Sequence, residues 1–322
     1  MKNIYLILAA ILILAMLLLP LIAITENSNA ITDIGQGPGN ETPVMPASTD
    51  TFRVLMSESN QVIEISAEDY VFGVVAAEMS VNNEPEALKA QAVAAYTFAL
   101  YKKGKNSAQD YDISDSFKTD QAYIPREQAR QRWGDKADEN EAKLNDIVKS
   151  VYGEYMSYGG APIFAAYHAM SSGRTESSEN IWDKALPYLV AKESVGDKLQ
   201  SNYISVVTVS IDEFKSKMEG CNFEGDAAGW FGAVDRTESG TVKSITICKN
   251  TYKGSEIREK FELRSPAFEV TADGTNVTFT VRGYGHGVGM SQCGANYMAQ
   301  QGSGYREILS WYYTSVEFCK IQ

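Results

Sequence analysis

A run of alternating glycines near the carboxyl end constrains this chain more than any other feature. From Arg282 to Gln292 the sequence reads RGYGHGVGMSQ, which sets His286, one of only two histidines in the chain, between glycines. Glycine adopts backbone conformations that other residues avoid, so such a loop lets the main chain approach a ligand while a few polar side chains recognise it. The spacing is not that of a phosphate-binding loop, and no lysine follows. We interpret the loop as a binding site; a glycine-rich turn with a trapped histidine is the simpler alternative.

The amino terminus is apolar from Ile4 to Ile24, about the length that a helix needs to cross a bilayer. We therefore expect residues 1–25 to be an uncleaved membrane anchor, because a signal peptide usually has a shorter apolar core. The small residues Ser28-Asn29-Ala30 keep cleavage open as the alternative. Lys2 on the short flank predicts a cytoplasmic amino terminus, with everything after Thr25 extracytoplasmic in a single-pass protein of the cell membrane.

The rest of the chain divides by composition. Residues 26–50 are rich in Asn, Gly, Pro, Ser and Thr and lack an apolar period, which predicts a flexible extracytoplasmic linker. Residues 51–322 carry enough apolar side chains for a packed core and are long enough for one large domain or two smaller ones.

Charge and cysteine content narrow the functional classes. The net charge of −12 argues against a nucleic-acid partner and against adhesion to an anionic membrane through a basic patch. A neutral or weakly charged polymer fits better as the binding partner.

Outside the membrane the four cysteines can form disulfides. Cys221 with Cys248 is the first pairing to expect, although sequence alone does not fix connectivity, and free thiols remain the alternative for these residues and for Cys293 and Cys319.

Periodic patterns predict an α+β fold. Phe52–Met56 and Val62–Ile65 alternate as a hairpin, and Ser66 with Asp69 predicts the start of a helix that carries Glu78 beside its apolar face. Pro85 begins a second, alanine-rich helix through Leu100. Further helices are expected at 125–133, 138–150, 296–300 and 305–313, and strands at 163–167, 203–209, 244–247, 268–271 and 276–281. The expected architecture is mixed helices and a mainly antiparallel sheet with a central substrate cleft between the Glu78 helices and the His286 loop, preceded by a single transmembrane helix.

Glu78 is the candidate catalytic residue. Val71, Val74 and Val75 lie on nearby turns of the same helix, which is expected to end just after Ser80. Burial and the carbonyl end of a helix both favour the neutral carboxylic acid. A glutamic acid that stays protonated near neutral pH is a general acid, able to protonate the leaving oxygen of a glycosidic bond. The alternative is a solvated, inert glutamate at a frayed helix end.

Two further polar residues accompany Glu78. Gln91 on the second helix is placed to bind a sugar or orient Glu78, or it is an ordinary surface amide. His168 follows a predicted strand and precedes a turn of small residues, where side chains often reach a cleft. No pair of candidate ligands has zinc-like local spacing, so no metal is predicted.

Several separated segments, in order, resemble the stage II sporulation protein D family. They are VVAAEM (74–79), EALKAQAVAA (86–95), YH (167–168) with SSGRTE (171–176), GYGHGVGMSQCGA (283–295) and the tail 305–313. The resemblance covers residues 51–322. It implies a membrane-anchored lytic transglycosylase of the sporulating mother cell, which cleaves peptidoglycan glycan strands during engulfment after an amidase has removed their stem peptides.

The resemblance also implies roles for residues and partners. Glu78 matches the family's catalytic acid, and the residues matching its cleft are Lys89, Gln91, Tyr167, His168, Ser172, Tyr284, His286 and Gln292. No cofactor is expected. The implied partners are glycan strands, the amidase stage II sporulation protein P and the membrane protein stage II sporulation protein M.

Two departures from the family pattern matter. Tyr96 stands where the family usually has an arginine, which removes a possible bidentate hold on substrate, and Cys293 stands where tyrosine is common. Some relatives bind zinc through cysteine and histidine in the region matching Asp110 to Tyr123, and this chain has neither residue there. No structural zinc is therefore predicted.

Three functions remain open. A lytic transglycosylase needs only Glu78, which would first protonate the oxygen between N-acetylmuramic acid and N-acetylglucosamine and then accept a proton from the 6-hydroxyl, giving a 1,6-anhydro sugar. A hydrolytic muramidase needs a second acid, for which Glu176 and Glu179 are the candidates within a motif. The third is a noncatalytic glycan-binding module that stimulates a partner amidase, as the related amidase enhancers suggest.

Sugar rings stack on aromatic faces, and the candidates for this contact are Tyr123, Tyr167, Trp182 and Tyr284. The alternative for each is packing in the core.

Overall fold

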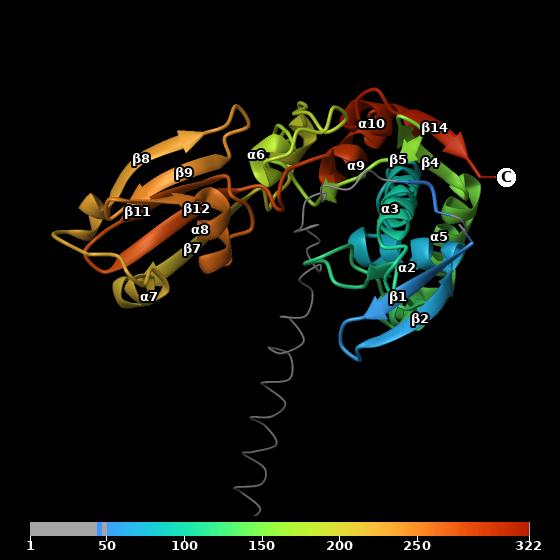
Figure 1. Ribbon diagram of the computed structural model, residues 1–322, viewed down its shortest axis with the longest axis horizontal. Coiled ribbons are helices and arrows are strands. Elements are labelled where there is room, and N and C mark those ends of the chain that lie inside the picture. Colours follow the sequence, from blue (N-terminus) through green and yellow to red (C-terminus); the bar gives the residue numbers. More distant parts are fainter. Residues whose placement is uncertain (1–43, 47–49, 322) are drawn as a thin grey trace, which may run out of the picture. The chain divides into compact units, whose positions relative to one another are not determined.

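The computed structural model describes residues 44–46 and 50–321, all within one compact unit that spans 32–322. It is an α+β protein whose sheets are mostly antiparallel (Figure 1). The predicted membrane anchor and most of the predicted linker lie outside the described residues. Within those residues no helix combines the length and apolarity that a membrane span requires.

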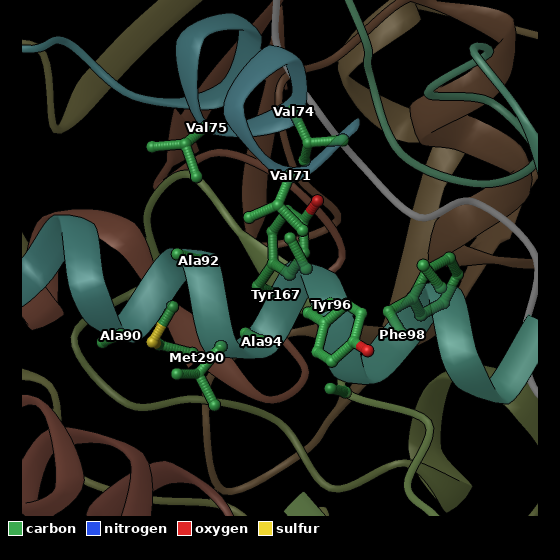
Figure 2. Close-up of a cluster of buried hydrophobic side chains, with 14 of the residues drawn as sticks. Val71, Val74, Val75, Ala90, Ala92, Ala94, Tyr96, Phe98, Tyr167 and Met290 are labelled. Atoms are coloured by element: carbon green, nitrogen blue, oxygen red, sulfur yellow. The ribbon is translucent and has the colours of Figure 1, made fainter. Parts of the chain in front are cut away.

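Helix α3 (Pro85–Lys105) is the central element of the first of two hydrophobic cores. Its buried alanines, among them Ala90, Ala92 and Ala94, present little bulk, so neighbouring elements approach closely (Figure 2). Tyr167 and Met290, which lie far apart in the sequence, pack in this cluster with Val71 of α2. The elements in contact with α3 include α2 (Ala67–Glu78), α5 (Ala137–Val151), β4 (Glu154–Tyr158), α9 (Gln292–Gln300) and α10 (Tyr305–Tyr312).

Short strands complete the first core. The hairpin of β1 (Thr51–Met56) and β2 (Gln61–Ser66) pairs as predicted, and β3 (Ile113–Ser114) joins β1 in parallel. β4 lies between β5 (Ala161–Pro162) and β14 (Glu317–Lys320), while β6 (Tyr167–His168) pairs in parallel with β13 (Met290–Ser291). The remaining elements are α4 (Arg126–Trp133), α6 (Glu179–Trp182) and the 3₁₀ turns at Gly134–Lys136 and Val195–Leu199.

The second core is formed between residues 207 and 281 by two three-stranded antiparallel sheets. Phe214 lies at its centre and stacks on Phe261 with ring centroids 5.0 Å apart. One sheet contains β8 (Phe231–Arg236), β9 (Val242–Ile247) and β10 (Asn250–Lys253); the other contains β7 (Ile204–Ser210), β11 (Phe268–Ala272) and β12 (Asn276–Arg282). Two helices, α7 (Ile211–Lys217) and α8 (Gly254–Lys260), and a 3₁₀ turn at Ala227–Trp230 complete it.

The expected strand at 163–167 is wrong for most of its length. Residues 163–166 are fully buried but irregular, and only Tyr167 enters the short strand β6. An apolar run of this length is buried in either case, so its composition does not distinguish a strand from a packed irregular segment.

The expected Cys221–Cys248 disulfide is not present, because all four cysteines are free thiols in the structure. The two side chains are nevertheless neighbours. Cys221 interacts with Tyr252 at 3.0 Å between sulfur and hydroxyl, and burial and the Cys221 thiol raise the pKa of Cys248 to about 11.

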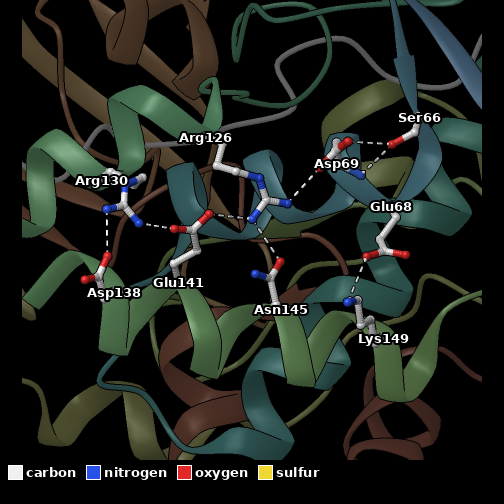
Figure 3. Close-up of polar contacts among 9 residues, drawn as sticks. All are labelled: Ser66, Glu68, Asp69, Arg126, Arg130, Asp138, Glu141, Asn145 and Lys149. Atoms are coloured by element: carbon white, nitrogen blue, oxygen red, sulfur yellow. Dashed lines mark hydrogen bonds and ion pairs between the residues drawn. The ribbon is translucent and has the colours of Figure 1, made fainter.

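Arg126 of α4 connects three helices through charged contacts (Figure 3). Its guanidinium pairs with Asp69 at the start of α2 at 2.7 Å and with Glu141 of α5 at 3.0 Å, and it donates to Asn145 at 2.9 Å. The guanidinium also lies 3.9 Å from the centroid of the Phe72 ring. Hydrogen bonds from Arg126 lower the pKa of both Asp69 and Glu141. This network fixes α4 against α2, the helix that carries Glu78.

We expect Arg126→Met to lower the free energy of unfolding by about 1 kcal/mol at neutral pH, the upper range for partly exposed ion pairs. The two acids have folded-state pKa values below their ordinary ones. The stabilisation is therefore complete above about pH 5 and is lost as the pH falls through the lowered values. Urea unfolding at pH 7 and pH 3 measures this. Arg132→Met, on the exposed surface of the same helix, is the control; a deficit of equal size at both pH values would contradict the ion-pair explanation.

Candidate active site

Glu78 lies at the carboxyl end of α2 and accepts hydrogen bonds from three segments that are distant in the sequence. Its Oε1 accepts from the backbone N–H of Ala122 and the hydroxyl of Tyr167, each at 3.1 Å, and its Oε2 accepts from Nε2 of Gln292 at 3.0 Å. Glu78 is 8% exposed. The expectation of a carboxyl group beside the apolar face of the helix is confirmed, and the frayed, solvated alternative is wrong.

Gln121 orients Tyr167 and was not identified from the sequence. Its Nε2 donates to the carbonyl of Ala95 at 3.2 Å, so its Oε1 faces the Tyr167 hydroxyl at 2.8 Å. The single hydrogen of this phenol has two acceptors within reach, Oε1 of Glu78 at 3.1 Å and Oε1 of Gln121 at 2.8 Å. Burial and then the negative charge of Glu78 raise the pKa of Tyr167 well above its usual range, so the phenol stays protonated. Gln121 lies in a polar segment with no local motif, and a single sequence offers no signal for its role.

Gln292 is positioned by the start of helix α9. Ser291 caps this helix by accepting from Gly294 N–H at 3.1 Å, and its hydroxyl donates to the buried Asp197 at 2.7 Å. From the first helical position Gln292 reaches Glu78 and, at 3.4 Å, Oε1 of Gln91. Gln91 is fully buried, so the surface-amide alternative is wrong, and the Gln292 amide lies within hydrogen-bond distance of both Gln91 and Glu78. Sugar binding and orientation of Glu78 both stay predictions for Gln91.

Val288 fixes opposite tautomers in the two histidines. Its N–H donates to Nδ1 of His286 at 2.9 Å, so in neutral His286 the ring proton is on Nε2. Its carbonyl lies 3.1 Å from Nδ1 of His168, which must carry the proton there. The ring centroids are 5.6 Å apart, and Trp182 lies 5.0 Å from His286. Both histidines are buried, and each presents its Nδ1 to the backbone of Val288.

The alternating glycines allow the loop to approach the protein's own main chain. Gly283, Gly285, Gly287 and Gly289 all have positive φ, between 73° and 111°. A Cβ at Gly289 would lie 2.0 Å from the carbonyl oxygen of Ala166, and one at Gly283 would lie 2.6 Å from that of Ser171. The loop is thereby held against residues 166–176, which include His168 and Ser172.

The other predicted site residues make contacts away from Glu78. Lys89 pairs with Glu86 at 2.7 Å, and Ser172 donates to the carbonyl of Ser239 at 2.5 Å. The guanidinium of Arg264 lies over the Tyr284 ring, 3.9 Å from its centroid. Tyr123 stacks on Tyr70 with centroids 5.5 Å apart. Their roles in binding substrate stay predictions.

Glu176 and Glu179 differ in environment. Glu176 is buried, and its carboxylate accepts from Asn180, from Thr237 and from the backbone N–H of Ser177. Glu179 is exposed. Neither shares a hydrogen-bond partner with Glu78 among the contacts of the described residues. Across residues 44–46 and 50–321, no three His, Cys, Asp or Glu side chains converge as metal ligands would.

Comparison with known proteins identifies the family of this chain. A family model described as stage II sporulation protein matches residues 56–158. Stage II sporulation protein D of Bacillus amyloliquefaciens is 35% identical over 332 residues, covering 98% of this chain and 96% of that protein. The protein of the same name from Bacillus subtilis is also 35% identical, over 92% of this chain and 86% of its own length. The chain belongs to the stage II sporulation protein D family. The amidase enhancer of Bacillus subtilis is 28% identical over 75% of this chain and 39% of that protein.

Tyr96, which the family resemblance leads us to expect as an arginine, packs as an aromatic residue in the first core. Tyr96 is 4% exposed and lies 6.2 Å, between ring centroids, from both Phe52 and Tyr152. Thr97 is also buried, donating to Val93 O at 2.7 Å and accepting from Met156 N at 3.0 Å. Residues 96 and 97 of α3 therefore contribute to packing and to backbone contacts within the first core.

We expect Gly289→Ala to be more destabilising than Gly302→Ala. Both glycines have positive φ, which costs an alanine about 1 kcal/mol, but a Cβ at Gly302 meets open space whereas one at Gly289 collides with Ala166. Urea unfolding should give a loss at Gly289 at least twice that at Gly302. Equal losses would mean that the loop can move away from residue 166.

Proposed function

We propose that this protein is a peptidoglycan lytic transglycosylase in which Glu78 is the sole catalytic carboxyl group. The supporting observation is the environment of Glu78: it is nearly buried, on the last residue of a helix, and its position is fixed by Ala122, Tyr167 and Gln292. One well-held carboxyl group that can give and take a proton is what this reaction requires. Membership of the family supports a role in sporulation, and similarity to a protein named amidase enhancer supports a cell-wall setting.

The hydrogen bonds suggest how Glu78 holds its proton. If the Tyr167 hydrogen is directed to Gln121, a lone pair on the phenol oxygen faces Oε1 of Glu78 at 3.1 Å. A protonated Glu78 then donates to Tyr167 while its Oε2 still accepts from Gln292. When the proton passes to the glycosidic oxygen, the Ala122 N–H and the Gln292 amide remain as donors to the new carboxylate. Both protonation states are therefore hydrogen-bonded, with little movement of the surroundings.

The reaction then uses the same carboxylate a second time. It accepts the proton of the muramic acid 6-hydroxyl as that oxygen attacks the anomeric carbon, which forms the 1,6-anhydro ring and regenerates the acid. No activated water is needed, so the second acid of a hydrolase is not required. In the full proposal the chain is anchored by its amino-terminal segment, acts outside the cytoplasmic membrane during engulfment, and follows the amidase stage II sporulation protein P in a complex with stage II sporulation protein M.

We expect Glu78→Gln to reduce release of 1,6-anhydro products from peptide-free glycan by about 10²- to 10⁴-fold, the usual contribution of a general acid. Glycan binding should be kept, because glutamine matches the size of the side chain. Mass spectrometry of products and a sedimentation assay with insoluble glycan measure the two effects. Glu179→Gln is the control, since this acid is exposed in a neighbouring motif. Reducing-end muramic acid products that depend on Glu179 would instead indicate a muramidase.

The second candidate is a noncatalytic module that binds glycan and stimulates an amidase. It is favoured by the similarity to the amidase enhancer and by Tyr96, which stands where the family resemblance implies an arginine. Binding without any anhydro product, in the wild type as well as in Glu78→Gln, would support this candidate over the enzyme.

A further inference from the structure

Strand β7 (Ile204–Ser210) is the longest edge strand in the part of the chain that the structure describes. It ends the sheet in which β12 lies between β11 and β7, and it pairs on one side only, with β12. On its other side, the outward N–H and C=O groups of its seven residues have no described strand to bind. Such an edge is a template on which another chain can add a strand.

The other long edges carry charges that oppose such pairing. Among the described edge strands of four or more residues, β7 alone has no charged side chain. The charged residues of the others are Glu64 of β2, Asp235 and Arg236 of β8, Lys253 of β10, Glu269 of β11, and Glu317 and Lys320 of β14. Proteins commonly block an edge with charges, so their absence from β7 indicates an edge that is used.

Both faces of β7 suit an extension of the sheet. Val207 packs against the second core on the inner face. On the outer face Ile204 and Val206 are 54% and 61% exposed, although both are apolar. The Thr208 hydroxyl lies 3.2 Å from that of Thr278 on β12, so a polar row already runs across the sheet. A further strand beside β7 would cover the two apolar side chains without burying a charge.

We propose that β7 pairs antiparallel with β7 of a second copy of this chain, so that two three-stranded sheets become one of six strands. A two-fold axis at Val207 uses all seven residues of each strand. It places Val206 opposite the partner's Thr208 and Ile204 opposite the partner's Ser210. These cross-strand pairs are uncharged, so the interface avoids like-charge contacts although each copy carries a net charge of −12.

The chemistry of the strand favours a second copy over a different protein. An edge selects a partner of different sequence through complementary charges or through pockets for alternate side chains. β7 offers no charge, and Arg282, opposite Ile204 on β12, is already paired with Glu269 at 2.8 Å. Five of the seven residues of β7 are β-branched, which suits both sides of a strand pair. The strand therefore supplies the same kind of segment that its edge accepts.

The dimer is expected to be weak. A single strand pair is small compared with the roughly 1,200 Å² that a stable interface buries. We therefore expect a dissociation constant of about 100 µM, between the micromolar and millimolar ranges. This inference does not depend on the proposed function, because it applies equally to an enzyme and to a binding module.

Sedimentation equilibrium of the full chain in detergent micelles, from about 10 µM to about 1 mM, measures this association. Val206→Lys should raise the dissociation constant at least about tenfold, because it gives β7 the kind of charge that the other edges carry. Val234→Lys is the matched control: Val234 is 39% exposed and lies on the edge strand β8, so the association should not change. Thermal unfolding checks that each variant is folded.

A charge exchange tests the register. Thr208→Glu alone should also weaken the association, because each copy then brings a carboxylate to the interface. An equal mixture of Val206→Lys and Thr208→Glu should associate about tenfold more tightly than either variant with itself, since the lysine of one copy faces the glutamate of the other. Raising the salt concentration should reduce this gain. A variant that had lost its fold would not regain association on mixing.

A wild-type chain that stays monomeric up to about 1 mM would overturn the inference. A dimer that Val206→Lys leaves unchanged would also overturn it, because that dimer would form through another surface. A mixture that associates no better than its separate variants would contradict the two-fold pairing of β7. None of these outcomes bears on the release of anhydro products, so the proposed function stands or falls separately.

Discussion

The hydrogen bonds to the Glu78 carboxyl group are the interaction on which the rest of the site depends. Ala122, Tyr167 and Gln292 come from a loop, a short strand and the first turn of a helix, and each is held by its own part of the first core. Shifting any one of these segments would remove a donor from a nearly buried carboxyl group, which is costly. The packing of α3 against α2 and α9 is therefore a requirement for the geometry of the acid, as well as for stability.

The glycine-rich loop serves this arrangement through its backbone. Its positive φ angles and its close approach to Ala166 and Ser171 place Met290 and Ser291 in a parallel pair with Tyr167 and His168. That pairing brings Tyr167 and Gln292 to the same carboxyl group. Val288, in the same loop, sets the tautomers of both histidines. One short loop thus connects the candidate acid, the histidine pair and the residue on which Arg264 stacks.

Much of the local structure follows from patterns in the sequence. Ser66 and Asp69 define the start of α2, Pro85 and the alanines define α3, and alternation defines β7, β11 and β12. Exposed segments such as β8 and the two short helices of the second core were missed, because they carry little apolar periodicity. The segment 163–166 is wrongly predicted as a strand because it is buried on all sides. A continuous apolar run is also typical of a fully buried strand, so the pattern does not separate the two structures.

The sequence by itself determined the family, the mixed fold and the position of Glu78 beside the apolar face of its helix, since these rest on local order and on motifs that keep their spacing. Only the tertiary structure decided which groups meet at the carboxyl: Gln121 and the N–H of Ala122 carry no motif, and Gln292 lies 214 positions away. It also decided that Gln91 is buried within hydrogen-bond distance of Gln292. Hydrogen-bond partners and burial depend on how distant segments pack, and neither is encoded in the spacing of any one segment.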